Sequence, residues 1–461
     1  MSSTSSLAEP STNRRPPSID DTGPLTTPGE HRIRPTELEA QSNVRAVLEL
    51  CVAGRLRCSE KTGRPGSSTV GTVASHLANG DFYSAEPIAA FAWPLLLQAG
   101  GLAKNNAGRL ELTAKGRAAL SKPAADVIRG LWQRWLTHGV IDEFSRIEEI
   151  KGQRSRNALS AVRPRRGTVG RALADCLPMD GWIGIDALFA SMRRAGLNPS
   201  VHRSEMALWK LYLGDAQYGS LGYDGCHRWE LLEGRYTLAV LFEYAAPLGL
   251  IDVEYVHPSG ERDDFRDNWG GDWIGALSRY DGLQAIRLTA LGRYALGLRD
   301  EYQPTATGEG GTLKVLSNLD IVATGTPTKA DELQLSAFAE RTADRVWAVS
   351  AKSLLSAMDA GRDPAEFATF LDGRADTGLP GTMQTLFHDV AHRAGRLTDL
   401  GHARVIECAD PAVAAHLAND RTLRGLCRPL GERHLAVPLE AEPRFRTGLR
   451  RLGYVMPGSL A

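Results

Sequence analysis

One segment carries side chains with the spacing of a zinc-dependent hydrolase. Residues 388–395 place two histidines one helical turn apart, as in the H-E-x-x-H-x-x-G arrangement that binds zinc and supplies a glutamate as general base. Here Asp389 replaces the glutamate, and Thr398 stands where a third histidine ligand would be expected. The helical periodicity puts His388 and His392 opposite an apolar face formed by Met383, Leu386, Phe387, Val390, Ala391 and Ala394. Because a catalytic zinc site needs three ligands and an orienting shell, we predict surface histidines and no metal site.

Other catalytic patterns are missing from the sequence. No G-x-x-x-x-G-K-[ST] phosphate loop occurs, and residues 63–68 lack the lysine that such a loop needs. There is no Gly-x-Ser-x-Gly elbow, and no cysteine has a histidine partner by motif. We therefore predict no catalytic residues and no cofactor. A metal-dependent hydrolase acting through His388 and His392 is the only enzymatic alternative.

The six cysteines are scattered, and no two form a Cys-x-x-Cys pair. This spacing is typical neither of a zinc finger nor of a disulfide framework, and it favours reduced thiols in the cytoplasm. The N-terminus lacks a basic and then apolar leader, and no run of about 18 apolar residues occurs. We expect a cytoplasmic protein that makes no contact with a membrane.

Cationic side chains gather in two stretches, although the whole chain balances 54 Lys and Arg against 54 Asp and Glu. Contact with a polyanion would therefore depend on local clusters. The first group lies between two predicted helices and in a predicted hairpin: Arg55, Arg57, Lys61, Arg64, Lys104 and Arg109. The second group lies in residues 151–171, which contain no acidic residue: Lys151, Arg154, Arg156, Arg163, Arg165, Arg166 and Arg171.

Both groups are predicted to contact DNA, because guanidinium groups pair with phosphate and release counterions. Gly, Ser, Asn and Pro within residues 151–171 predict a flexible, solvated basic connector, and the alternative is a linker that only separates two domains. For the first group the apolar stretch 88–97 favours a scaffold that docks a protein over DNA contact through the loop and the hairpin.

A third cluster is acidic and aromatic. Residues 258–282 form an insertion in a predicted hairpin and contain Asp263, Asp264, Asp267 and Asp272. Acidic groups repel phosphate, whereas tryptophan and tyrosine are frequent anchors of protein interfaces. We predict a partner-binding loop; the alternative is a hairpin that packs its aromatic side chains on its own domain. The predicted contact residues are Phe265, Trp269, Trp273 and Tyr280.

Two segments with the same element order must position these clusters. Each is predicted to run helix, Gly-Leu, strand, turn, strand, Leu-Thr-x-x-Gly-Arg and helix, with the threonine capping the last helix. Three helices, a hairpin and a closing helix is the order of a winged helix. In the first copy, residues 88–97 at the recognition-helix position are almost all apolar and cannot read base edges.

The fold class predicted is α+β or α/β multidomain, with two winged-helix-like modules followed by a C-terminal α/β domain. The predicted boundaries are a disordered tail at 1–38, module 1 with a helical extension at 39–150, the basic connector at 151–171, module 2 at 172–300, a linker at 301–311 and the α/β domain at 312–461.

Residues 312–455 resemble the N-terminal domain of XPB/Ssl2-type repair helicases, as found in bacterial helicase-associated proteins. The matching residues are the runs 313–322, 350–354 and 359–361, Leu371, Leu379-Pro380, Asp389, 393–397 and 449–454. The resemblance implies work linked to DNA beside a helicase, while the motor motifs are absent.

Together these features predict a non-catalytic, DNA-associated adaptor that works with a helicase or nuclease partner in repair, transcription or defence against foreign DNA. The alternative is a protein–protein scaffold that never touches DNA. The apolar stretch 88–97 and the zero net charge favour that scaffold, and the basic segment 151–171 opposes it.

Overall fold

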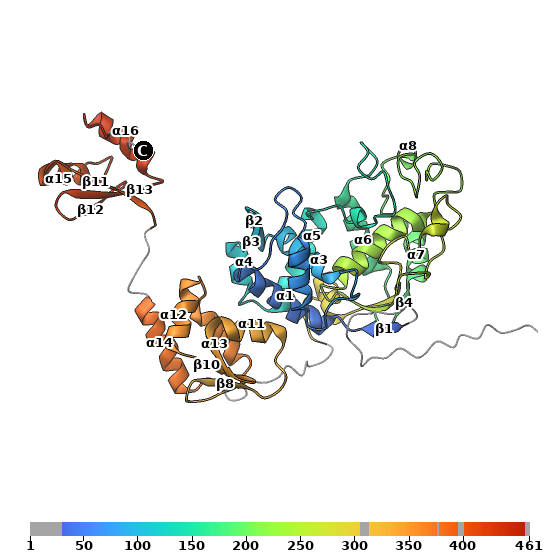
Figure 1. The fold of residues 1–461 in the computed structure, drawn as a ribbon, viewed down its shortest axis with the longest axis horizontal. Coiled ribbons are helices and arrows are strands. Elements are labelled where there is room, and N and C mark those ends of the chain that lie inside the picture. Colours follow the sequence, from blue (N-terminus) through green and yellow to red (C-terminus); the bar gives the residue numbers. More distant parts are fainter. Residues whose placement is uncertain (1–29, 305–312, 376–377, 395–400, 457–461) are drawn as a thin grey trace, which may run out of the picture. The chain divides into compact units, whose positions relative to one another are not determined.

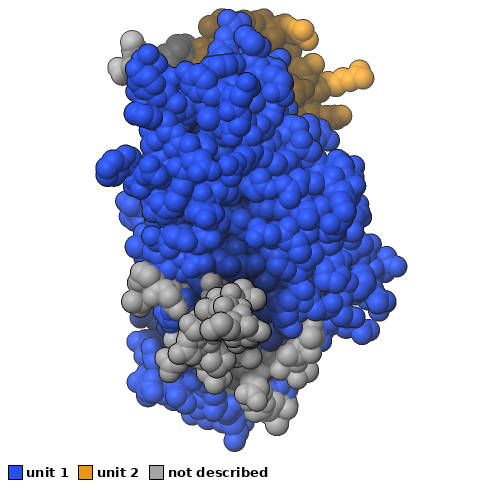
Figure 2. Space-filling model, turned by 90° about the vertical axis from the view of Figure 1, so that its right-hand side faces the viewer, with its two compact units in different colours: residues 1–388 blue, residues 389–461 orange. Residues whose placement is uncertain are grey.

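The computed structural model describes residues 30–304, 313–375, 378–394 and 401–456 (Figure 1). Most of the predicted tail and linker, residues 1–29 and 305–311, lies outside the described residues. The chain divides into two compact units, residues 1–388 and 389–461, which Figure 2 colours separately. The structure is mixed helix and sheet, in agreement with the α+β class.

The first module covers most of the N-terminal third of the chain. Residue Arg57, between its first two helices, pairs with the second hairpin strand at Arg109 and adds a short third strand to the hairpin. The elements are α1 (Glu37–Val52), α2 (Ser67–Ala74), α3 (Ala89–Ala99), β2 (Ala103–Asn106), β3 (Arg109–Leu112) and α4 (Ala114–Ala119), extended by α5 (Ala124–His138) and η1 (Glu143–Arg146).

The second module repeats this order with longer connections. Its elements are α6 (Val162–Asp175), β4 (Ile183–Gly184), α7 (Ile185–Arg194), α8 (Glu205–Leu208), the consecutive helical segments η2 (Glu230–Gly234), α9 (Arg235–Ala239) and η3 (Val240–Ala245), then β5 (Ile251–Val256), η4 (Gly271–Trp273), β6 (Leu283–Leu288) and α10 (Ala290–Ala295). As in the first module, a short strand that precedes the second helix, β4, pairs with the second hairpin strand, β6.

The repeated Leu-Thr-x-x-Gly-Arg string has the same local structure in both modules. The hydroxyls of Thr113 and Thr289 each accept a hydrogen bond from the backbone N–H three residues on and cap the closing helix. A Cβ at either following glycine would lie 2.0 Å from a carbonyl oxygen at the start of the first hairpin strand. Glycine is therefore needed at Gly116 and Gly292 for the helix to approach the strand, and the predicted threonine cap is confirmed in both copies.

The two modules do not form separate domains. Their buried apolar residues form one continuous core from Ala40 to Ala295. Strand β1 (His31–Arg34) precedes module 1 in the chain but pairs antiparallel with β5 of module 2, giving a sheet of order β1-β5-β6-β4. The prediction of a disordered tail up to residue 38 is therefore wrong for residues 31–38, because this strand and the start of α1 are ordered by pairing and packing.

Residues 313–388 form a small α/β part of the first unit. Its sheet has the order β7-β8-β10-β9, and four helices accompany it, two of which begin with the caps that the sequence predicts at Thr328 and Asp363. The elements are β7 (Leu313–Val315), β8 (Asp320–Ala323), α11 (Lys329–Phe338), β9 (Glu340–Ala343), β10 (Val346–Ala348), α12 (Ala351–Asp359), α13 (Pro364–Asp372) and α14 (Gly381–Ala394).

A buried ion pair joins this part to module 1. The Arg362 guanidinium, at the turn between α12 and α13, donates to both carboxylate oxygens of Glu49 on α1 at 2.5 and 3.0 Å. It also contacts Glu366 at 2.7 Å and lies over the ring of Phe338. Since both partners are almost fully buried, the pair fixes the contact between α1 and this part of the chain.

The second unit has its own small core around Leu423, Leu435 and Phe445. Its sheet has the order β11-β13-β12, and its elements are β11 (Ala403–Glu407), α15 (Pro411–Asn419), β12 (Arg428–Leu430), β13 (His434–Pro438) and α16 (Glu442–Arg451). The region predicted as one domain, 312–461, thus divides between the two compact units.

Candidate functional site

The outward face of the module 1 hairpin presents three cations. Strand pairing sets Lys104 opposite Glu111 and Asn106 opposite Arg109, while Arg57 pairs with Arg109 from the third strand. Side chains alternate across a strand, so Leu110 and Leu112 point into the core and the charged residues point outward. We call Arg57, Lys104 and Arg109 the wing cations.

The wing cations are exposed, and none of the ion pairs found among the described residues includes one of them, although Glu111 faces Lys104 across the hairpin and accepts a hydrogen bond from Asn106. The tight turn that brings Lys104 and Arg109 together is the one predicted from the Asn-Asn-Ala-Gly string. Ala107 and Gly108 have φ values of +47° and +80°, which is the backbone of a two-residue hairpin turn. Cations without partners on a rigid hairpin remain available to an external anion.

The other members of the first basic group differ in exposure. Arg55 and Lys61 are exposed, and Arg55 Nη1 lies 3.3 Å from His76 Nε2. Arg64 is half-buried and donates to the Ser145 hydroxyl, so it holds the loop after α1 against η1. The structure brings Arg57, Lys104 and Arg109 together on one face and directs Arg64 inward.

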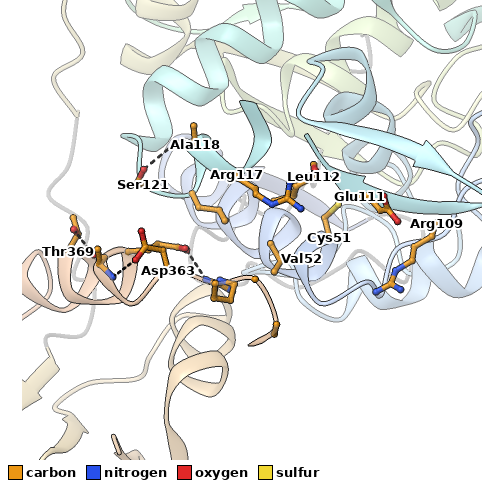
Figure 3. Close-up of a pocket in the computed structure, with 16 residues that line it drawn as sticks. Cys51, Val52, Arg109, Glu111, Leu112, Arg117, Ala118, Ser121, Asp363 and Thr369 are labelled. Atoms are coloured by element: carbon orange, nitrogen blue, oxygen red, sulfur yellow. Dashed lines mark hydrogen bonds and ion pairs between the residues drawn. The ribbon is translucent and has the colours of Figure 1, made fainter. Parts of the chain in front are cut away.

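A hollow of about 600 Å³ lies between module 1 and the turn from α12 to α13 (Figure 3). Arg109, Glu111 and Arg117 line it from module 1, and Asp363 and Thr369 line it from the other side. Its charges are mixed. The thiol at its base, Cys51, is protonated at neutral pH, because burial raises its pKa to about 12.

The second basic group is not the solvated connector that the sequence predicted. Residues 151–160 are tied to residues 201–212 by backbone hydrogen bonds, including Lys151 N–H to Tyr212 O at 2.8 Å and Ser160 N–H to Val201 O at 2.8 Å. Residues 162–175 form helix α6, which packs on α5. The prediction of a flexible segment is wrong, because residues 151–160 are held by backbone hydrogen bonds and the rest of the segment is helical.

Two arginines of this group are internal. Arg165 Nη2 lies 2.6 Å from Asp142, and Arg166 Nη2 lies 2.7 Å from Glu143 Oε1, with both guanidinium groups almost fully buried. Neither is accessible to phosphate, so their prediction as DNA contacts is wrong. The remaining members are exposed: Lys151, Arg154, Arg156, Arg163 and Arg171.

The four predicted contact residues in the insertion of the module 2 hairpin form two pairs that differ in burial. Phe265 and Tyr280 are fully buried, and the Tyr280 hydroxyl donates to the Glu243 carboxylate. They belong to the core of the module, so their prediction as partner contacts is wrong. Trp269 and Trp273 are 59% and 92% exposed.

Other exposed aromatic rings adjoin these tryptophans. Tyr218 lies 5.3 Å from Trp269 between ring centroids, and Trp209 packs on Tyr223 at 4.9 Å. An open hollow of about 910 Å³ lies among four of these rings and the carboxylates of Asp215, Asp267 and Asp272. We call the five rings the aromatic patch: Trp209, Tyr218, Tyr223, Trp269 and Trp273.

The structure also assembles a group of potential metal ligands, although the sequence predicted no metal site. His202, His227 and Glu233 each present one ligand atom, and these atoms lie within 4.8 Å of one another. Burial alone would raise the pKa of Glu233, but hydrogen bonds from His202, His227 and the Val201 N–H outweigh it and hold the pKa at about 2. The only sequence signal was the position of Glu233 in the mostly apolar run 231–246, which also carries Arg235 and Glu243, because a charged group needs a partner when it is buried.

The zinc-like pair on α14 has a different setting. Met383, Phe387 and Val390 are buried, as the helical periodicity predicts, while His388 and His392 are exposed. Leu386 is only half-buried, and the prediction that Ala391 belongs to the buried face is wrong, because this residue is exposed. Thr398, at the position of a third ligand, lies outside the described residues.

Comparison with known proteins identifies one region. Residues 313–428 match the family model described as helicase conserved C-terminal domain. No curated protein is matched by the chain. The match covers the α/β part of the first unit and much of the second, and it supports a helicase-associated protein with a helicase-related role. Every helix of the described residues is too short or too polar to traverse a bilayer.

Proposed function

We propose that the chain is a non-catalytic, DNA-associated adaptor of a helicase or nuclease, and that the wing cations are its principal contact with DNA. The observation that carries the proposal is that Arg57, Lys104 and Arg109 share one outward face and lack carboxylate partners among the described residues. Lysine and arginine on such a face neutralise phosphates and release counterions.

The element order and the repeated threonine cap support the interpretation of both modules as winged-helix-like. In module 1, α3 occupies the position of a recognition helix, and nearly all of its residues are buried. A buried helix has no side chains for base edges, so the proposed binding is to the phosphate backbone and independent of sequence.

The helicase link rests on the matched region, residues 313–428. We further propose that this region is related to the N-terminal domain of XPB/Ssl2-type helicases. The hollow in Figure 3 runs from Arg109 to α13 of this region, so a strand held by the wing would lie beside it. Because the motor motifs are missing from the sequence, we propose that a separate cytoplasmic partner supplies them, in repair, transcription or defence against foreign DNA.

The aromatic patch is the proposed site for that partner. Its rings are exposed beside three aspartates, which suits a segment of the partner that carries basic and apolar side chains. Replacing Trp269 and Trp273 with alanine should deplete a helicase or nuclease from the proteins that bind the tagged chain, and an unchanged set of bound proteins would contradict this assignment.

The DNA proposal is tested by fluorescence anisotropy with a short labelled duplex over a series of salt concentrations. Each phosphate contact contributes about 0.9 to the slope of log K against log salt, so the variant R57A/K104A/R109A should lose about 3 from that slope. A matched variant, K122A/R134A/R194A, removes the same charge from exposed positions outside both basic groups and should retain the slope.

The second candidate function is a protein–protein scaffold with no DNA contact, which the buried α3 favours. Absence of DNA binding by the wild-type chain at low salt would leave this scaffold as the better account. If binding is present but the wing variant and its matched control lose the same slope, the exposed residues Arg154, Arg156, Arg163 and Arg171 become the next candidates.

A further inference from the structure

Three side chains from two segments, the loop at residues 201–203 and residues 227–233, converge in module 2, away from the wing cations. His202 lies in the loop that pairs with Leu159, His227 lies in the loop before η2, and Glu233 lies in η2 itself. The turns of η2 are of the wide π type, which occurs frequently at functional sites. Glu233 is 1% exposed, whereas the two imidazoles are partly accessible to solvent.

The contacts of the two histidines with Glu233 are long for hydrogen bonds and close to the spacing of two ligands on one ion. His202 Nδ1 lies 3.4 Å from Glu233 Oε1, and His227 Nε2 lies 3.4 Å from Glu233 Oε2. A good N–H···O bond spans about 2.7–3.2 Å, and the buried Nδ1 atom of His202 has no hydrogen bond of good geometry. Two ligands of a tetrahedral zinc ion, each about 2.0–2.2 Å from the metal, lie about 3.3–3.6 Å apart. Each histidine is at this distance from a different oxygen of Glu233, and the three ligand atoms lie within 4.8 Å of one another, so the side chains must close slightly around an ion.

Outer contacts hold the ligands in place. The Val201 N–H donates to Glu233 Oε1 at 2.9 Å and fixes the carboxylate next to the His202 loop. On the far side of the imidazole, His202 Nε2 lies 3.7 Å from Glu205 Oε1. Metal-binding histidines usually donate their second ring nitrogen to a carboxylate. At 3.7 Å Glu205 is too far away for that hydrogen bond in this structure and would have to approach His202 when the ion binds.

We propose that His202, His227 and Glu233 bind a divalent transition-metal ion, with zinc as the first candidate. Two imidazoles and one carboxylate are borderline ligands that suit zinc, and they leave a fourth position for solvent or an anion. The ion would tie the loop at residues 201–203 to the segment 227–233. This loop also carries the backbone bonds that hold residues 158–160, so the site would brace the basic segment.

The test uses the full chain after removal of metal with a chelator. Zinc binding is measured by calorimetry, the bound metal is counted by elemental analysis, and cobalt is used as an optical probe of geometry. The wild-type chain should bind one ion per chain and give the visible absorption of tetrahedral cobalt. Absence of the intense charge-transfer band of cobalt–thiolate bonds would exclude the six free cysteines as ligands.

Loss of an outer partner weakens metal binding by about 10–100-fold, and E205Q should weaken zinc binding by about 10-fold. H227A and E233Q each remove a ligand, so each should weaken zinc binding by more than that range. The control variant H388A/H392A removes the other pair of histidines with zinc-like spacing and should bind as the wild type does. Circular dichroism reports whether E233Q folds; if it does not, H227A decides, because its imidazole is more exposed.

Failure of the metal-free wild type to bind zinc or cobalt would overturn the proposal. So would affinities of H227A and folded E233Q equal to that of the wild type, or loss of binding in H388A/H392A. A preference for iron over zinc with the same ligand dependence would keep the site and change its metal. None of these outcomes depends on DNA binding by the wing.

Discussion

The two hairpins of this protein are built alike and charged differently. Both begin after a glycine with positive φ, Gly101 or Gly249, and both end at a threonine that caps the closing helix. Their strand registers coincide, since Ala103 pairs with Leu112 and Ile251 pairs with Leu288.

The outward positions can therefore be compared one by one. The wing cations Arg57, Lys104 and Arg109 correspond to Gly184, Asp252 and Ala285 of module 2. Asp252 is nearly buried and paired with Arg287 at 2.7 Å, and strand β1 covers the edge of β5. The hairpin of module 1 thus presents cations to solvent. In the hairpin of module 2, the corresponding charge is paired and the strand edge is covered.

The difference teaches that charge in this chain has two separate uses. Some ions lie inside and pair there, as Arg235 does with Asp264 and Asp281 in module 2 and Glu49 of module 1 does with Arg362. Module 1 leaves its hairpin cations without partners, which costs little stability and keeps them available to an anion.

The largest effect is expected for R235A. The Arg235 side chain is fully buried and donates to Asp264 at 2.5 and 2.7 Å and to Asp281 at 3.0 and 3.2 Å. Its removal leaves the buried Asp281 carboxylate with only the Leu277 N–H and the Ser278 hydroxyl as donors and no compensating cation, and should lower the free energy of unfolding by about 3–5 kcal/mol. Urea denaturation followed by circular dichroism measures the loss, and a loss under about 1 kcal/mol would show that these ions are not structural.

A similar contrast is expected within the insertion of module 2. Phe265 is fully buried, so F265A should lower the free energy of unfolding by about 3–5 kcal/mol. W273A removes a larger ring that is 92% exposed and should change it by less than about 0.5 kcal/mol. Thermal unfolding of both variants checks the pair. Equal losses would mean that Trp273 packs on the protein in solution and is not available to a partner.

Sequence alone could predict the features whose causes are local. The threonine caps, the hairpin turn at Ala107-Gly108 and the buried face of α14 all depend on residues within a few positions of one another, and all are present. The partners of the buried ions are distant: Arg166 meets Glu143, 23 residues away, and Arg235 meets Asp281, 46 residues away.

The composition of the candidate sites likewise depends on contacts between residues that are distant in the sequence. No periodicity distinguishes Arg163, which is exposed, from Arg165 and Arg166, which are not, because tertiary packing decides which face of α6 is covered. The cluster of His202, His227 and Glu233 combines the loop at residues 201–203 with the segment 227–233, which the fold brings together, so no motif marks it. Strand β1 likewise finds its partner at β5, more than 200 residues along the chain.

The repeated caps should contribute equally in the two modules. Replacing a capping threonine with alanine costs about 1 kcal/mol, so T113A and T289A should each lower the free energy of unfolding by about that amount. Chemical denaturation of the two single variants measures this. A marked difference between the variants would break the equivalence of the two modules on which the comparison depends.

The smallest effect on stability is expected at the wing itself. R109A removes an exposed cation that has no carboxylate partner among the described residues, so the free energy of unfolding should change by less than about 0.5 kcal/mol. The same variant should reduce the salt slope of DNA binding by about 0.9. A large loss of stability with an unchanged salt slope would mean that Arg109 stabilises the fold and does not contact DNA.

The most direct test of the account is to map where DNA touches the full chain, by photo-crosslinking to a duplex with reactive groups along its backbone and identifying the linked peptides by mass spectrometry. The account predicts crosslinks at Arg57, Lys104 and Arg109, with none at the corresponding Gly184, Asp252 and Ala285. Crosslinks confined to module 2, or none at the module 1 hairpin while DNA is bound, would contradict it.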